Sequence, residues 1–123
     1  MENKKASRLS IIIVSYNSSS LLEECLDSIL KYPPGQNYGI VVVDNNSTDG
    51  SQELVRNKYP EVKLIANKSN VGFAAANNMA IKSTDSDFIL LLNSDCQVYE
   101  NSLDEMLDFI EGMTEAAVVG PKI

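Results

Sequence analysis

Residues 9–17 read LSIIIVSYN, a short run of mostly β-branched apolar residues that ends in Ser15, Tyr16 and Asn17. Apolar residues that do not alternate with polar ones are typical of a strand buried on both faces of a parallel sheet. The pattern recurs in residues 39–44 (GIVVVD), 62–66 (VKLIA) and 87–93 (DFILLLN). These four segments predict the strands of one sheet.

Amphipathic segments separate these strands. Apolar residues at helical spacing predict helices over residues 21–30, 51–59, 73–81 and 103–110, and a fifth strand is expected at 116–119. Strands that alternate with helices predict an α/β fold. We expect a doubly wound, mostly parallel sheet with helices on both faces and the first strand near its centre.

Length and composition indicate one globular domain. The chain has 123 residues, of which 44% are hydrophobic and 22% charged. We expect residues 1–8 to form a flexible tail and 9–123 to form the folded part. The longest apolar runs, such as residues 88–92, fall far short of the roughly 20 residues that span a bilayer. The sequence therefore predicts no membrane span, and its charged start does not resemble a signal peptide.

Charge and residue usage exclude several chemistries. A net charge of −7 disfavours nucleic acid as a partner, because phosphate backbones bind basic surfaces. Histidine is absent, which excludes Ser-His-Asp and Cys-His catalysis and leaves carboxylates for any acid–base step. Cys25 and Cys96 form no CxxC or Cys/His group, which favours a reducing, cytosolic setting without a zinc site or disulfide scaffold.

Polar residues follow each predicted strand, where ligands bind in doubly wound sheets. The first strand is followed by VSYNSSS without a glycine, which disfavours the NAD, FAD and P-loop classes. Asp44 and Asn45 follow the second strand, and the polar turn from Asn70 to Gly72 follows the third. Each stretch also has the composition of a turn or a helix cap, so the alternative for any one of them is purely structural.

Asp95 is the strongest single candidate for a functional residue. It follows the apolar run FILLL within Asn93-Ser94-Asp95, which places it at a fixed point on the predicted sheet edge. Mg²⁺ or Mn²⁺ bound with a phosphate ligand needs only one or two protein carboxylates. The alternative is that the tripeptide is an ordinary turn.

Five motifs, in order, resemble the inverting nucleotide-sugar glycosyltransferases of the GT2 family, which have the GT-A fold. They are IIIVSYNSSSLLEECLDSIL, VVVDNNSTDGS, NVGFAAANN, LLLNSD and VVGPKI. The pattern looks most like bacterial rhamnosyltransferase-type enzymes of cell-surface polysaccharide synthesis. The resemblance covers residues 9–123.

The resemblance implies roles for individual residues in binding the donor. The residues from Ser15 to Asn17 would line the base and ribose pocket, and Asp44 with Asn45 would take the place of an acidic pair that contacts the base. Gly72 and Asn78 would lie on the nucleotide-facing loop and the helix after it. The Asn93-Ser94-Asp95 stretch would take the place of the DXD-type metal motif, with Asp95 as the ligand of Mg²⁺ or Mn²⁺.

The resemblance also implies a reaction and its partners. It predicts a single displacement with inversion, from a dTDP- or UDP-linked sugar to a glycan or lipid-linked acceptor, by a cytoplasmic protein that is peripheral at the inner face of the membrane. The base that deprotonates the acceptor is expected beyond Ile123, so the chain alone would be inactive. Two alternatives are a non-catalytic nucleotide-sugar-binding or interaction module of the same fold and a receiver-like domain, which is disfavoured because the first strand ends in Ser15.

Overall fold

The computed structural model describes residues 7–112 as alternating strands and helices. The expected strand at residues 116–119 and most of the expected tail lie outside the described residues. None of the helices within 7–112 has the length and apolar character that a membrane crossing requires. The elements, in chain order, are β1 (Ser7–Ser15), α1 (Ser19–Lys31), β2 (Tyr38–Asp44), α2 (Ser51–Lys58), β3 (Lys63–Ala66), α3 (Phe73–Lys82), β4 (Ser86–Asn93) and α4 (Ser102–Glu111).

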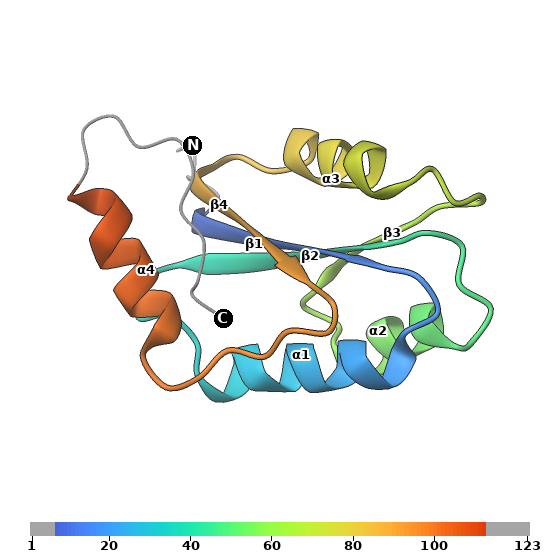
Figure 1. The fold of residues 1–123 in the computed structure, drawn as a ribbon, viewed down its shortest axis with the longest axis horizontal. Coiled ribbons are helices and arrows are strands. Elements are labelled where there is room, and N and C mark those ends of the chain that lie inside the picture. The colour runs from blue at the N-terminus through green and yellow to red at the C-terminus, as the bar shows by residue number, and fades with distance from the viewer. Residues whose placement is uncertain (1–6, 113–123) are drawn as a thin grey trace, which may run out of the picture.

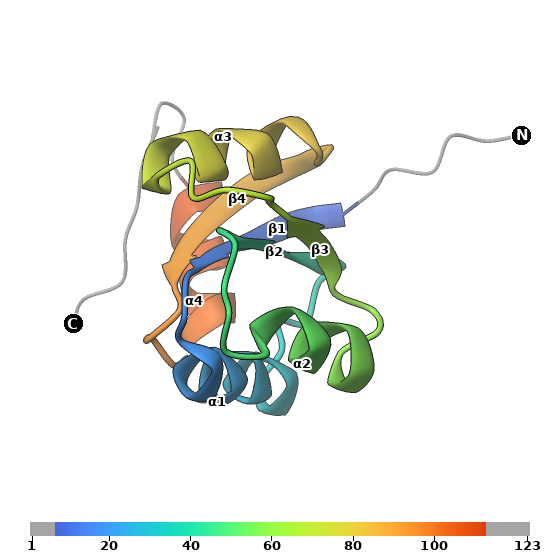
Figure 2. The same cartoon turned by 90° about the vertical axis from the view of Figure 1, so that its right-hand side faces the viewer.

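The four strands form one parallel sheet with the order β3-β2-β1-β4, so β1 is central as predicted. In the register, Ile12 lies opposite Val41 on one side and Leu91 on the other. Figures 1 and 2 show α1 and α2 on one face of the sheet and α3 on the other. The chain progresses outward from β1 to β3 and then returns to β4, so the strand order reverses between β1 and β4.

Side chains of alternate residues on the strands fill two separate cores. The larger core packs α1, α2 and α4 against the face of β1 that carries Ile11 and Ile13. The smaller core packs Ala76 and Ala80 of α3 against the opposite face. Because alanine is small, α3 can approach the sheet closely. The remaining buried members of the smaller core are Ile12, Val41 and Val43.

The prediction that every strand is buried on both faces is wrong for β4. Leu90 and Leu92 are buried, but Ile89 and Leu91 on the other face are 40% and 49% exposed. The reason is that α3 packs over β1 and β2, while β4 is an edge strand of the described sheet. The side chains of β3 are likewise only half-buried or exposed.

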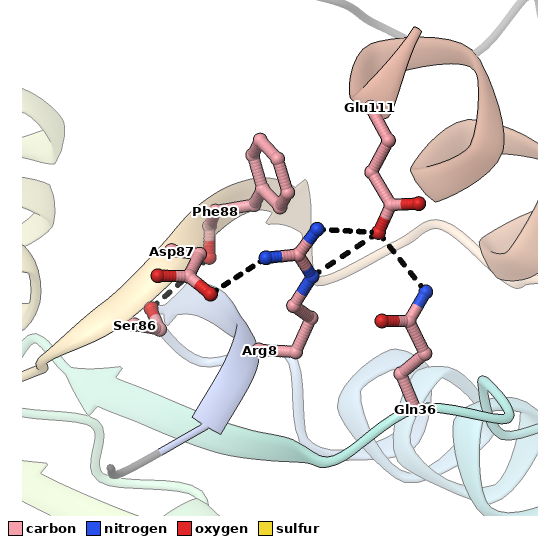
Figure 3. A network of polar contacts seen from close by, with 6 residues as sticks. All are labelled: Arg8, Gln36, Ser86, Asp87, Phe88 and Glu111. Carbon is pink, nitrogen blue, oxygen red and sulfur yellow. Dashed lines mark hydrogen bonds and ion pairs between the residues drawn. The ribbon is translucent and has the colours of Figure 1, made fainter.

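A network around Arg8 ties the starts of β1 and β4 to the end of α4 (Figure 3). The Arg8 guanidinium donates to Asp87 at 2.7 Å and to Glu111 at 2.7 and 3.1 Å. It also lies 4.8 Å from the centre of the Phe88 ring, and Gln36 donates to Glu111 at 3.1 Å. These contacts lie at the amino edge of the sheet, opposite the loops that follow the strands.

Candidate functional site

Parallel strands bring the loops that follow them to one edge of the sheet, on the right in Figure 1. Hydrogen bonds join these four loops to one another, so the polar residues that the sequence singles out form one assembly. Ligands of doubly wound sheets bind at this edge, near the point where strand order reverses, which here lies between β1 and β4. The predicted residues in the four loops are Ser15, Tyr16, Asn17, Asp44, Asn45, Asn70, Gly72, Asn93, Ser94 and Asp95.

Three hydrogen bonds join the loop after β1 to the loop after β2. The Asn17 N–H donates to Ser47 Oγ at 2.8 Å, and the Thr48 N–H donates to Asn17 Oδ1 at 2.8 Å. The Ser19 N–H donates to Asp49 Oδ2 at 3.0 Å. Asn17 has a φ of +48°, a left-handed conformation that asparagine tolerates better than most residues. The exposed turn at the start of α1 is thereby held in one conformation beside a hollow lined by residues 17–21 and Asp49.

Serine hydroxyls join the loop after β1 to the loop after β4. Ser18 Oγ lies 3.3 Å from both Ser15 Oγ and Ser94 Oγ. Ser15 is buried, whereas Ser18 and Ser94 are half-buried. This chain of hydroxyls fixes the Asn93-Ser94-Asp95 stretch against the start of α1.

Asp44 ends β2 as a buried carboxylate that the protein itself surrounds with donors. Ser47 donates to it twice, through its N–H at 2.8 Å and through its hydroxyl at 2.6 Å. Gln52 donates its side-chain N–H to the same carboxylate at 2.8 Å. These three bonds use most of the acceptor capacity of a carboxylate and hold the loop between β2 and α2. The contact of Asp44 with a nucleobase stays a prediction.

Asp95 lies in a turn closed by the Cys96 N–H, which donates to the Asn93 carbonyl at 3.0 Å. This turn leaves the Asp95 side chain exposed. Within residues 7–112 its carboxylate has one hydrogen-bond contact, to the thiol of Cys96 at 4.0 Å. The stretch Asn93-Ser94-Asp95 can therefore form a turn and still present a carboxylate that binds a metal ion. The carboxylate is available to a ligand from solvent.

The oxygen atoms at this edge suit a hard cation such as Mg²⁺ or Mn²⁺ that takes most of its ligands from water and substrate. In the described part of the chain, no three His, Cys, Asp or Glu side chains gather in a group that could hold a metal ion. An Mg²⁺ or Mn²⁺ ion at Asp95 would take its other ligands from water and phosphate oxygens, as is common for these ions. The oxygens of Asp95 fit such a group, and the role of Asp95 stays a prediction.

The two adjacent asparagines of α3 differ in burial. Asn78, predicted for the site, is exposed, whereas Asn77 is only 6% exposed and lies on the same side of the helix as Ala76 and Ala80. The Asn77 amide makes no hydrogen bond within residues 7–112. Every fully enclosed side-chain nitrogen or oxygen in that range has a partner, so the Asn77 amide reaches solvent.

Sequence reasoning also missed Asp49, Ser47 and Asn67, which hold the loops together. Asp49 accepts the hydroxyl and the N–H of Ser51, at 2.6 and 3.1 Å. These bonds, the hydroxyl first, together with the N–H of Ser19, lower the pKa of Asp49 below its usual value. An aspartate two residues before Ser51, at the start of a predicted helix, was the signal for an Asx turn at Asp49. No local signal reveals that Asp49 also binds Ser19.

Curated relatives match this chain over part of their length. The poly(ribitol-phosphate) beta-glucosyltransferase of Bacillus spizizenii is 36% identical over 107 residues, which cover 83% of this chain and 17% of that protein. The N-acetylglucosaminyl-diphospho-decaprenol L-rhamnosyltransferase of Mycobacterium tuberculosis is 28% identical over 126 residues, or 94% of this chain and 41% of that protein. The chain therefore spans less than half the length of these relatives.

Solved structures of glycosyltransferases share the fold. TarS 1–349 of S. aureus in complex with UDP superimposes with a TM-score of 0.75 at 30% identity, over 85% of this chain and 32% of that one. The mannosyltransferase PcManGT of Pyrobaculum calidifontis, in complex with GDP-Man and Mn²⁺, gives a TM-score of 0.76 at 27% identity over the same shares. These similarities confirm the predicted GT-A fold.

The sequence model of the family described as "Glycosyl transferase family 2" matches residues 10–122. That match spans β1 from its fourth residue, the other three strands, the four helices and all the loops at the carboxyl edge of the sheet. The resemblance stated from the five motifs is confirmed, and the chain belongs to glycosyl transferase family 2.

Proposed function

We propose that this chain binds the nucleoside diphosphate part of a sugar donor at the carboxyl edge of the sheet, between the ends of β1 and β4. The observation that carries the proposal is the hydrogen-bonded assembly of four loops at the point where strand order reverses. It leaves Asp95 exposed beside the start of α1. The UDP complex of TarS and the GDP-Man complex of PcManGT support a nucleotide-sugar as the ligand class.

Asp95 is the residue that would hold a divalent cation in this site. Such an ion, Mg²⁺ or Mn²⁺, neutralises a diphosphate and stabilises it as a leaving group. The Mn²⁺ in the PcManGT complex supports a metal requirement. With a net charge of −7, the chain needs a cation to accept a diphosphate, because no lysine or arginine is among the predicted site residues.

We further propose that the whole protein transfers the sugar with inversion to a glycan or lipid-linked acceptor of cell-surface polysaccharide synthesis. The names of the two relatives support this acceptor class. The general base beyond Ile123, the choice between dTDP and UDP, and a cytoplasmic location stay predictions. A non-catalytic module that binds the same ligand is the alternative, favoured by the single carboxylate in the Asn93-Ser94-Asp95 stretch.

Calorimetric titration of the 123-residue chain with UDP and dTDP, with and without Mn²⁺, tests donor binding. We expect binding that depends on Mn²⁺ and is lost in Asp95→Ala. Glu100→Ala is the matched control, because it removes an exposed acid five residues further along the same loop. The loop has left the edge by that point, since the Val98 N–H donates to Ser28 Oγ in the third turn of α1 at 3.0 Å.

The outcomes separate the parts of the proposal. Equal affinity of Asp95→Ala and the unmodified chain contradicts the metal role of Asp95. No binding of either nucleotide, with or without Mn²⁺, contradicts donor binding at this edge. Product formation by the whole protein, with inverted configuration at the anomeric carbon, distinguishes the enzyme from the binding module.

A further inference from the structure

Asn45, the first residue after β2, links two of the loops through an amide whose oxygen and nitrogen both make hydrogen bonds. Its side chain is buried, with the residue 2% exposed. Its Nδ2 donates to the Gly72 carbonyl at 3.2 Å. Its Oδ1 accepts the side-chain N–H of Asn67 at 3.0 Å and the Val71 N–H at 3.3 Å. The two backbone partners fix the orientation of the amide. The Val71 N–H needs an acceptor, which is Oδ1, and the Gly72 carbonyl needs a donor, which is Nδ2.

This one side chain makes most of the hydrogen bonds that anchor the loop between β3 and α3. The Asn67 N–H adds a bond to the Asp44 carbonyl at 2.9 Å. Within the described part of the chain, every hydrogen bond that joins residues 68–72 to another loop ends on Asn45. Inside residues 68–72, the Gly72 N–H donates to Asn70 Oδ1 at 2.9 Å. Gly72 has a φ of +88°, and its carbonyl also accepts the Ala76 N–H, so it sets where α3 begins.

We propose that Asn45 is a positioning residue for the donor site, which holds residues 67–72 and the first turn of α3 against the sheet edge. The inference rests on the proposed function. Both lone pairs of Oδ1 are used and the residue is enclosed, so Asn45 acts through the loop and does not contact the nucleotide itself. The resemblance to a base-contacting acidic pair does not foresee this role.

The amide of Asn45 serves this role in a way that a carboxylate at the same position could not. A carboxylate at this position can still accept from Asn67 and Val71. It cannot donate to the Gly72 carbonyl, and it brings a negative charge toward that oxygen. We therefore expect Asn45→Asp to loosen the loop at neutral pH. A protonated Asp side chain has one O–H donor. Burial beside the Gly72 carbonyl oxygen favours the protonated form and raises the pKa of the substituted side chain, so acid restores the missing bond.

The side-chain contacts of Asn45 contain no ionisable group. Asp44, its neighbour in the chain, directs its carboxylate to Ser47 and Gln52. Lys68 lies exposed in the anchored loop. The pH response of Asn45→Asp therefore reports on the substituted side chain once each value is divided by that of the unmodified chain at the same pH.

The first experiment measures amide hydrogen exchange of the full chain without nucleotide, in the unmodified protein, Asn45→Asp and Asn45→Ala. We expect at least roughly tenfold faster exchange in residues 68–76 of both variants, with little change in β1, since a buried hydrogen bond is lost. Unchanged exchange in residues 68–76 overturns the inference. This outcome does not depend on whether a nucleotide binds.

The second experiment measures affinity for UDP with Mn²⁺ at pH 7.5 and pH 5. Relative to the unmodified chain, Asn45→Asp should bind about tenfold more weakly at pH 7.5 and recover most of that loss at pH 5. Asn45→Ala should be weak at both pH values. An equal loss for Asn45→Asp at both pH values overturns the donor role of the amide, whereas failure of the unmodified chain to bind contradicts the proposed function alone.

Discussion

Ser47 donates to the Asp44 carboxylate through two atoms at once, its N–H at 2.8 Å and its hydroxyl at 2.6 Å. Gln52 supplies a third donor at 2.8 Å. Replacing Asp44 by Asn leaves one oxygen and introduces an N–H that must face at least one of these donors. We expect Asp44→Asn to lower the free energy of unfolding by about 1.5–3 kcal/mol, as for a buried hydrogen bond to a charged group.

Urea denaturation of the chain measures this effect. Asp85→Asn is the control, because it makes the same chemical change at an exposed position in the loop between α3 and β4. We expect the control to stay within about 0.5 kcal/mol of the unmodified chain. Equal stabilities of the two variants would show that the three bonds to Asp44 do not stabilise the fold.

Sequence patterns predicted the elements well because local signals define them. The apolar runs that contain Ile12 and Val42 are strands in the structure, and each of the four predicted helices is present. The exposure of Leu91 was not predictable, because its neighbours in the sequence are as apolar as those of Ile12. Its environment depends on which strands α3 covers, which is a tertiary property.

The residues of the candidate site were predictable as a set, but their contacts were not. The rule that ligands bind beyond the carboxyl ends of strands selected the four loops. It does not show that Asn45 turns toward Gly72, or that Asp49 reaches Ser19, because these partners lie 27 and 30 residues apart in the sequence. Contacts of this kind are set by how the loops pack.

We expect the hydrogen bonds of Asp49 to contribute less to the free energy of unfolding in acid than at neutral pH. Its bonds to Ser51 and to the Ser19 N–H lower its pKa in the folded state below the unfolded value of about 3.9. The stabilisation is therefore complete above that value and is lost as pH falls through the folded pKa. Because Asp49 is exposed, we expect a contribution of less than about 1 kcal/mol.

Thermal unfolding of the unmodified chain and Asp49→Asn, between pH 7 and pH 2.5, measures this contribution. The difference in Tm between the two proteins should be largest at neutral pH and shrink below about pH 4. A difference that is constant over this range would contradict the role of the Asp49 charge.

Substitutions of Asn77 and Asn78 in α3 test whether these side chains affect nucleotide binding or the stability of the fold. Asn77 is buried without a hydrogen bond inside the described residues, so Asn77→Ala removes no hydrogen bond of its amide there. Alanine also favours a helix over asparagine by a few tenths of a kcal/mol. We expect Asn77→Ala to leave the Tm nearly unchanged and to weaken UDP binding with Mn²⁺ by roughly three- to tenfold, since its amide has no hydrogen-bond partner in the described residues and is not fully enclosed.

Asn78→Ala is the matched variant, one position along and exposed. Calorimetric measurement of UDP affinity in both variants decides which amide contributes to nucleotide binding. A larger loss for Asn78→Ala would support the residue that the family resemblance selects and would leave Asn77 without a binding role.

The two cysteines should differ sharply in reactivity. Cys25 is fully buried in α1, and this burial raises its pKa to about 12, so almost no thiolate is present at neutral pH. Cys96 is half-buried in the turn after β4. We expect a thiol reagent such as 5,5′-dithiobis(2-nitrobenzoate) at pH 8 to modify one cysteine in the native chain and both in urea. Native Cys25→Ser should retain the reactive thiol and native Cys96→Ser should lose it, whereas rapid modification of Cys25 in native Cys96→Ser would mean that α1 opens readily.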